Sequence, residues 1–132
     1  MMQYMLDTNT VSHLIKKHPV VSRRVQDVPI TSLCISSITE GELLFGLAKR
    51  PEAKRLHAVV KEFLLRVDVL PWNNETAACY GTVRAGLESR GKILGSLDLL
   101  IASHALAAGA VLVTSDRAIF QVDSLHIEDW TV

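Results

Sequence analysis

The chain has 132 residues, enough to bury one substantial core and too few for two, so we expect residues 1–132 to form a single domain. Hydrophobic residues make up 48% of the sequence, which excludes an intrinsically disordered protein. The formal net charge is zero, but residues 1–66 hold ten Lys and Arg against six Asp and Glu, an excess that fits a polyanionic partner.

The first quarter of the chain alternates short apolar runs with segments of helical character. Residues 3–6 predict a strand, and helices are expected over residues 10–17 and 19–24. Residues 32–36, "SLCIS", predict a second strand, because they are apolar, prone to β-structure and ended by serines.

Two helices are expected next. Ser37 and Glu40 have the spacing of a capping box, which predicts a helix from Ser37 to about Lys49. Pro51 suits the first turn of a following helix that ends near Arg66.

The second half of the chain continues this alternation. Strands are expected over residues 67–72, 110–114 and 125–130, and helices over residues 73–90 and 96–108, each helix followed by a glycine that can end it. Strands separated by helices, without hairpin signals, predict an α/β fold whose parallel sheet is covered on both faces.

No segment of the sequence has the character of a membrane span or a secretory signal. The longest apolar stretch, residues 97–113, is interrupted by Asp98, His104 and Gly109, which predicts a buried helix, a turn and a strand. The two cysteines form no CxxC or metal-spaced pair, which suits a reducing compartment. We therefore expect a cytoplasmic protein.

Two acids directly follow predicted strands. Asp7 follows the first strand in "MLDTNT", and Asp116 follows the fourth in "VLVTSD". Ligands of parallel α/β folds bind outside the carboxyl ends of the strands, where these acids are expected. Both acids also have a simpler interpretation, because Asp favours turns and helix N-caps.

Two further acids lie on predicted helices. Glu42 is four residues after Ile38 and three before Phe45, a spacing that predicts an inward-facing stripe where a carboxylate needs a counter-charge. We assign Glu40 to capping and Glu42 to function. Asp98 lies in the first turn of its helix, where the helix dipole favours an acid, but its flanks are wholly apolar.

Taken together, these four acids predict a metal site. Like charges about 4 Å apart repel by roughly 4 kcal/mol at an effective dielectric constant of 20, so a cluster of acids calls for a cation. Oxygen ligands without Cys or His point to Mg²⁺, with Mn²⁺ as a substitute, and bound Mg²⁺ in turn implies a phosphate-bearing substrate. The candidate ligands are Asp7, Glu42, Asp98 and Asp116.

Several motifs, in order, carry a resemblance that spans nearly the whole chain: "MLDTNT", "ISSITEGELLFG", "LGSLDLLIASHALAAGAVLVTSD" and "IEDW". Together they resemble the PIN-domain ribonucleases, specifically the VapC-type toxins of bacterial toxin–antitoxin pairs. The stretches "VLPWN", "GLESRGKILGSLDLLIASHA" and "IEDW" are most similar to the subgroup that cleaves initiator tRNA in its anticodon loop.

The resemblance implies a three-layer α/β/α sandwich with a mainly parallel sheet, and a metal-dependent endoribonuclease. It implies that the four acids hold Mg²⁺ as catalytic residues, with Asp7 and Asp98 as the first choice for direct ligands. Short polar side chains would hold these carboxylates in place: Thr8, Asn9, Thr114 and Ser115. It further implies a VapB-type antitoxin as partner and tRNA as substrate, and we expect a homodimer.

Basic side chains of the N-terminal half are expected to contact the RNA backbone. They fall into two clusters, with solvated helix surface as the alternative interpretation: Lys16, Lys17, Arg23 and Arg24, then Lys49, Arg50, Lys54, Arg55 and Lys61.

Two other functions are compatible with parts of the pattern. An enzyme that forms an aspartyl phosphate would use Asp7 as nucleophile, but phosphatases of this kind need a second Asp two residues later, where this chain has Asn9. A non-catalytic module that binds a partner would need the acids only as helix caps, which leaves Glu42 unexplained.

Overall fold

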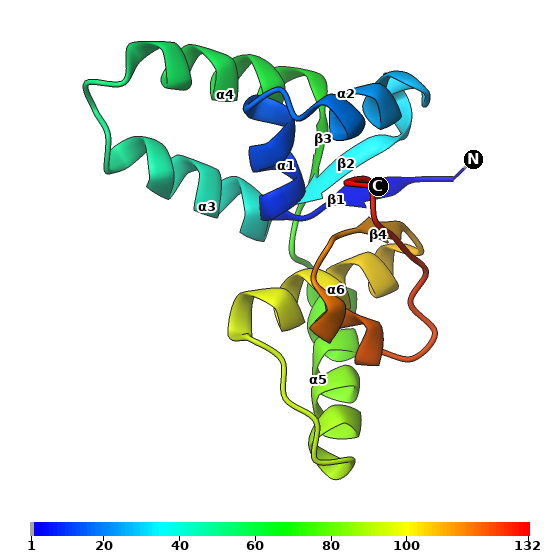
Figure 1. Ribbon diagram of the computed structural model, residues 1–132. Helices are drawn as coiled ribbons and strands as arrows, with labels where there is room; N and C mark the ends of the chain where they lie inside the picture. The colour runs from blue at the N-terminus through cyan, green and yellow to red at the C-terminus, as the bar shows by residue number, and fades with distance from the viewer. Residues whose placement is uncertain (1) are drawn as a thin grey trace.

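The computed structural model describes residues 2–132 and has a central sheet with helices on both faces (Figure 1). Within these residues the sheet has five strands: β1 (Tyr4–Leu6), β2 (Leu33–Ser36), β3 (Asp68–Leu70), β4 (Val111–Val113) and β5 (Ile127–Glu128). The same residues form six α-helices: α1 (Thr8–Ile15), α2 (Pro19–Gln26), α3 (Ser37–Ala48), α4 (Lys54–Arg66), α5 (Asn74–Ser89) and α6 (Ser96–Ala108). Two short 3₁₀ helices complete the described elements: η1 (Ile30–Ser32) and η2 (Arg117–Gln121).

All neighbouring strands pair in parallel, in the order β3-β2-β1-β4-β5. Along the chain, β2 and then β3 are added on one side of β1, after which β4 and β5 are added on its other side. The boundary between β1 and β4 is therefore a topological switch point, and ligands of open parallel sheets bind in the crevice at such points. The predicted α/β/α fold is confirmed.

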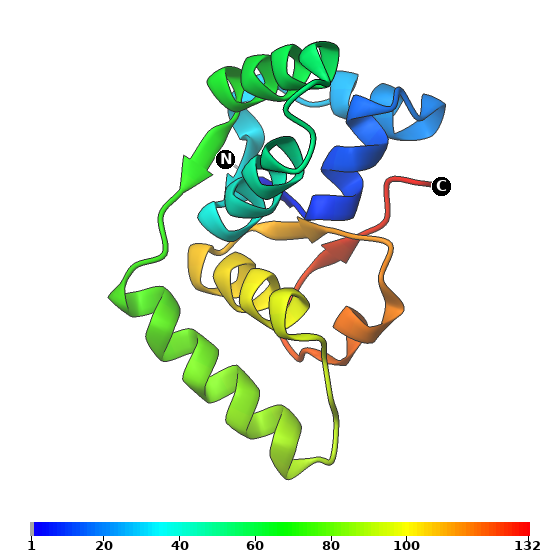
Figure 2. The same cartoon turned by 90° about the vertical axis from the view of Figure 1, so that its left-hand side faces the viewer.

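Successive residues of each strand point to opposite faces of the sheet, and each face packs into a separate hydrophobic core. Met5 and its neighbours in register, Cys34 and Leu112, face a core shared with α5, α6 and η2. The next residue of β1, Leu6, faces a second core shared with α1, α3 and α4. Figure 2 shows this arrangement, with α5 and α6 on one side of the sheet and α1 to α4 on the other. Burial on both faces explains why the three central strands, β1, β2 and β4, are mainly apolar, whereas the edge strands β3 and β5 each contain an acid.

Two of the predicted helix starts are wrong by two or three residues. The first helix begins at Thr8, because the Asp7 side chain caps it directly after β1. The fourth helix begins at Lys54 and not at Pro51. Pro51 instead occupies a turn that the Ala53 N–H closes by donating to the Arg50 carbonyl, and proline is favoured at the second position of such turns.

The predicted capping box is also wrong. The N-cap of α3 is Ser36, whose Oγ accepts a hydrogen bond from the Ile38 N–H, so Glu40 is the fourth helical residue and not the third. The reason is that β2 runs into α3 without a loop, and the last strand residue becomes the cap. In α6, Gly95 is the N-cap and Ser96 is the first helical residue.

None of the helices in residues 2–132 combines the length and the apolar character that crossing a bilayer requires.

Candidate active site

Asp7 lies at the point where β1 ends and α1 begins. Its backbone N–H donates to the Val113 carbonyl of β4 over 3.1 Å, and its Oδ1 accepts a hydrogen bond from the Thr10 N–H over 2.8 Å. The side chain is therefore the N-cap of α1, worth about 1 kcal/mol to the helix, and it is 96% buried. Capping occupies Oδ1, so Oδ2 is the oxygen available to a ligand.

Asp116 follows β4 and has a similar dual position. Its Oδ1 accepts from the Ala118 N–H over 3.0 Å and caps η2, while its own N–H donates to the Thr114 hydroxyl over 3.0 Å. Thr114 is fully buried and thus orients the turn that carries this acid. The capping interpretation of Asp7 and Asp116 is correct, and it leaves one oxygen of each carboxylate for another role.

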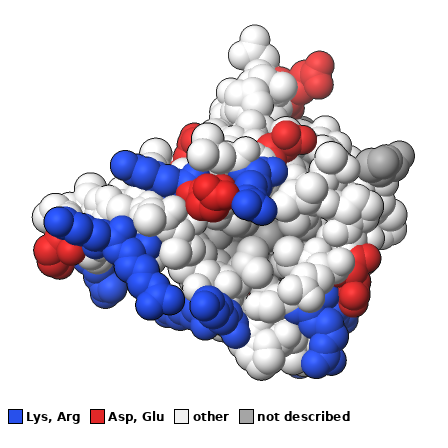
Figure 3. Space-filling view, turned by 90° about the horizontal axis from the view of Figure 1, so that it is seen from above, with Lys and Arg blue, Asp and Glu red and all other residues white. Residues whose placement is uncertain are grey.

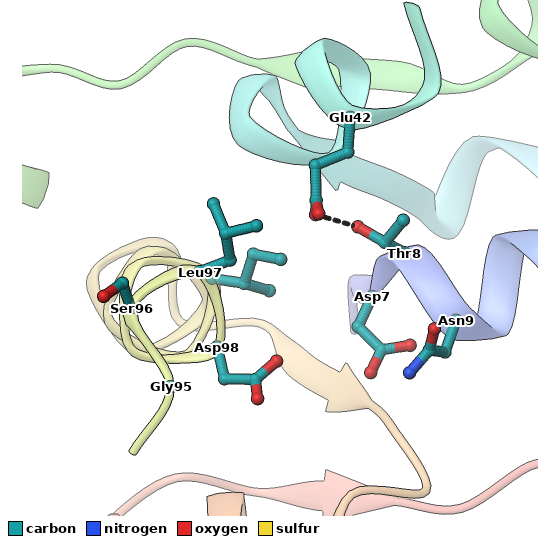
Figure 4. A pocket seen from close by; sticks show the side chains of 9 residues that line it. Asp7, Thr8, Asn9, Glu42, Gly95, Ser96, Leu97 and Asp98 are labelled. Carbon is teal, nitrogen blue, oxygen red and sulfur yellow. Dashed lines mark hydrogen bonds between the residues drawn. The ribbon is translucent and has the colours of Figure 1, made fainter. Parts of the chain in front are cut away.

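Glu42 reaches the same region from α3. Its Oε1 accepts a hydrogen bond from the Thr8 hydroxyl over 2.5 Å, and Thr8 also lies within 3.4 Å of the Thr39 hydroxyl. Figure 4 shows Glu42 pointing toward α1, with the carboxylates of Asp7 and Asp98 lying below it. Thr8 therefore links the first turn of α1 to the carboxylate on α3.

The stripe predicted for Glu42 is only partly correct. The buried row of α3 consists of Thr39, Leu43 and Leu47, whereas Phe45 is 62% exposed. Glu42 lies at the edge of the buried row and not in the core. The spacing rule placed Phe45 inside because it assumes that every large apolar side chain faces the core.

The carboxyl group of Asp98 is influenced by the charges of the other three candidate acids. Burial raises the pKa of its carboxyl from 3.8 to about 6, assisted by a hydrogen bond and the charge of Asp116 and by the charges of Asp7 and Glu42. A hydrogen bond between two carboxyl groups requires that one of them hold a proton. The structure thus brings together the four acids that the sequence predicts, from β1, α3, α6 and the loop after β4.

An open cavity of about 450 Å³ lies over three of these acids. Asp7, Glu42 and Asp98 line it, and Asp116 is close enough to Asp98 to raise the pKa of that carboxyl. The remaining lining residues come from the starts of α1 and α6: Thr8, Asn9, Gly95, Ser96, Leu97 and Ile101. Carboxylates at the floor of an open cavity are accessible to a cation and to a phosphate group bound to it.

The predicted supporting residues differ in how they contact the acids. Thr8 and Thr114 make the hydrogen bonds described above. Asn9 lines the cavity and is exposed, and Ser115 is exposed; in the described part of the chain neither has a hydrogen bond to an acid. Their supporting role stays a prediction.

Thr10 is a supporting residue that the sequence analysis missed. Its N–H caps onto Asp7 Oδ1, and its buried hydroxyl donates to the Val113 carbonyl over 3.1 Å. Thr10 therefore fixes Asp7 against β4 from two directions. The signal was available, because Thr10 stands three residues after Asp7, the spacing between an N-cap and the backbone N–H that donates to it.

The donor set suits a hard divalent cation. Three carboxylates line the cavity beside hydroxyl and amide groups, and burial together with the charges of Asp116, Asp7 and Glu42 raises the pKa of Asp98. Among residues 2–132, no three His, Cys, Asp or Glu side chains already surround a single point as a metal cage. Both observations are compatible with a hard cation that keeps several waters and binds only one or two carboxylates directly.

A second hollow, of about 260 Å³, continues from the cavity between α1, α3 and α4. Thr8 and Glu42 line both spaces, and Lys16, Lys49 and Arg50 line the second. Figure 3 views the molecule from above α2 and α4 and shows several Lys and Arg side chains on that face, with Asp and Glu side chains between them. The acid cluster therefore adjoins a hollow lined by three basic side chains, which can attract a phosphodiester chain.

Comparison with known proteins gives the chain its family. The PIN domain model matches residues 4–125. Ribonuclease VapC2 of Haemophilus influenzae is 38% identical over 133 residues, covering 98% of this chain and 99% of that protein. The tRNA(fMet)-specific endonuclease VapC of Salmonella typhimurium is 38% identical over 131 residues, with coverage of 98% and 99%.

Solved structures agree with the sequence comparison. The crystal structure of DNA-bound VapBC from Salmonella typhimurium matches with a TM-score of 0.89 at 39% identity, covering 98% of this chain and 99% of that chain. VapBC2 from Rickettsia felis, bound to a DNA fragment from its promoter, matches with a TM-score of 0.89 at 34% identity and the same coverage. The resemblance predicted from the motifs is confirmed, and the chain belongs to the PIN-domain family, among the VapC ribonucleases.

Proposed function

We propose that this protein is a Mg²⁺-dependent endoribonuclease that hydrolyses phosphodiester bonds of tRNA and acts as the toxin of a toxin–antitoxin pair. The observation that carries the proposal is the meeting of four carboxylates, three of which line an open cavity, with burial and the other three acids raising the pKa of Asp98 to about 6. Such a cluster is costly without a cation, so it is better explained by metal binding than by helix capping alone.

In this proposal Asp7 and Asp98 are direct ligands, and Asp116 completes the set directly or through water. Glu42 is a further ligand or orients the attacking water, with its carboxylate held by the Thr8 hydroxyl. When bound, Mg²⁺ supplies an activated water and stabilises the charge on the leaving oxygen. The hydrogen bonds from Thr10 and Ala118 keep the two capping carboxylates in one orientation, which lowers the cost of arranging them for reaction.

The substrate and partners are proposed from the relatives. One relative is named for its action on tRNA(fMet), and the matched crystal structures are VapBC complexes. We propose initiator tRNA as substrate, a VapB-type antitoxin as partner, a homodimer as assembly and the cytoplasm as location. The basic residues of the second hollow, Lys16, Lys49 and Arg50, provide phosphate contacts whose strength falls with salt.

The deciding experiment is cleavage of total tRNA by the purified protein in Mg²⁺, with the new ends mapped by sequencing. Cleavage at one position in the anticodon loop of initiator tRNA is the expected result, abolished by chelator. Release of phosphate from a phosphate monoester through a phosphorylated Asp7, or binding of tRNA without cleavage, would contradict the proposal and favour one of the two alternatives.

A further inference from the structure

A buried hydrogen bond outside the acid cluster joins the two helices that carry Glu42 and Asp98. The Nδ1 atom of His104 on α6 lies 2.7 Å from the Oγ of Ser36, the N-cap of α3. His104 is 3% exposed and Ser36 is fully buried. The bond spans 68 residues of sequence, so it is a tertiary link and not local helix structure.

The partners of these two groups determine where the protons lie. The His104 ring also interacts with the Pro71 backbone carbonyl, which only accepts, so the proton is assigned to the ring nitrogen that is not bonded to Ser36. Burial lowers the pKa of His104 below 6.5, and the ring is neutral at neutral pH. Nδ1 therefore accepts from the Ser36 hydroxyl, which in turn accepts from the Ile38 N–H.

The link occupies corresponding places on the two helices. Glu42 lies six residues after Ser36, and Asp98 lies six residues before His104, which is about 9 Å along each helix axis. The N-terminus of α3 has no loop before it that could absorb a shift, because β2 ends at Ser36 itself. A change at the link is therefore transmitted along α3 to Glu42.

We propose that Ser36 and His104 are positioning residues that set the place of Glu42 relative to Asp98. This inference rests on the proposed function, because it gives the spacing of the two carboxylates a role in RNA cleavage. Displacement of a reacting group by about 1 Å can lower a rate 10²-fold, whereas substrate binding away from the reacting bond is unaffected. Loss of the link should therefore lower kcat and leave KM nearly unchanged.

The chain contains a close control for Ser36. Ser103 is also a fully buried serine, but its hydroxyl donates to the Leu99 carbonyl within α6 over 2.8 Å, so Ser103→Ala removes a buried hydrogen bond without touching the link. Asn73→Ala controls for the loss of an N-cap, because Asn73 caps α5 as Ser36 caps α3.

The experiment compares Ser36→Ala and His104→Leu with the two controls, at a temperature at which circular dichroism shows every variant folded. We expect kcat for tRNA cleavage to fall at least tenfold in both link variants, with KM within threefold of wild type. His104→Asn, whose amide oxygen can replace Nδ1 as acceptor, should recover kcat to within threefold of wild type. Both controls should keep kcat within threefold.

Mn²⁺ affinity, measured by calorimetry without RNA, tests the same idea independently of cleavage. It should weaken at least threefold in Ser36→Ala and His104→Leu and stay unchanged in Ser103→Ala. Link variants equal to the controls in both kcat and Mn²⁺ affinity would overturn the inference, and Ser36→Ala decides it alone should His104→Leu fail to fold. A wild-type protein that cleaves no RNA would refute the proposed function, while the affinity series would still test the link.

Discussion

Neutralising Asp98 should stabilise the metal-free protein. In the folded chain the pKa of this carboxyl is raised from 3.8 to about 6, first by burial and then by Asp116, Asp7 and Glu42. Between these two values the folded state binds more protons than the unfolded state, so the stability contributed by Asp98 falls as the pH rises through this window. Asp98→Asn has nearly the same shape and no charge, and it removes that loss.

The size of the effect follows from the pKa. A difference from 3.8 to about 6 corresponds to about 3 kcal/mol above pH 7, as an upper bound. Because the cavity is open to water and salt, we reduce this to about 1–2 kcal/mol. The lost attraction between an acid and the first turn of α6 opposes it by about 0.3–1 kcal/mol. The net gain is about 1 kcal/mol, or roughly 3–6 °C in Tm for a chain of this size.

Thermal unfolding followed by circular dichroism in EDTA, from pH 4 to pH 8, measures this gain. The difference in Tm between Asp98→Asn and wild type should be full above pH 7 and shrink toward zero near pH 4, where both side chains are neutral in the folded state. Glu75→Gln is the control, because Glu75 is an exposed acid in the first turn of α5 and its removal should lower Tm slightly. Equal or lower Tm for Asp98→Asn at pH 8 would refute the crowded-acid interpretation.

Three further predictions concern the same site. Asp7→Asn should abolish RNA cleavage in Mg²⁺ while far-UV circular dichroism stays that of wild type, because the amide oxygen still caps α1; wild-type cleavage rates would remove Asp7 from the metal site. Millimolar Mg²⁺ or Mn²⁺ should raise the Tm of wild type above its value in EDTA by mass action, and identical melting curves would contradict a metal site. Glu42→Gln should lower the cleavage rate at least tenfold, about 1.4 kcal/mol of barrier, whereas Glu40→Gln should be nearly silent, and the reverse outcome would exchange their roles.

The order of helices and strands could be predicted from the sequence because apolar strand segments alternate with helical segments that have capping residues at their ends. Strands buried on both faces are apolar throughout, and the helices between them are bounded by Asp, Asn, Ser and Gly. The parallel order then follows, since strands linked through helices cannot form hairpins. Parallel strands bring their carboxyl ends to one edge, so the meeting of Asp7 and Asp116 was also predictable.

The helix start of α3 was predicted wrongly because two neighbouring serines both satisfy the sequence rules for an N-cap. Ser36 and Ser37 are both good N-caps, and the spacing to Glu40 favoured Ser37, but the ladder between β2 and β3 extends to Ser36 and puts the helix start there. Sequence spacing also gave no sign of the bond between Ser36 and His104, because a contact across 68 residues depends on how α6 packs against β2 and α3. His104 on an apolar helix was interpretable only as a buried residue until its partners were known.

Helix capping and metal binding are not competing explanations for Asp7. A carboxylate has two oxygens, and the cap occupies only Oδ1, so the same side chain can fix its own orientation through α1 and present Oδ2 to a cation. Asp116 does the same through η2. Because each cap is made by the backbone of the residues that immediately follow, the orientation of both acids is set locally, before any ligand binds. Within residues 2–132 neither Glu42 nor Asp98 caps a helix, and their placement depends on tertiary contacts: the Thr8 hydroxyl for one and the packing of α6 for the other. The site therefore combines two locally fixed acids with two that the fold must hold in place, which is why a distant link such as that between Ser36 and His104 can matter for its chemistry.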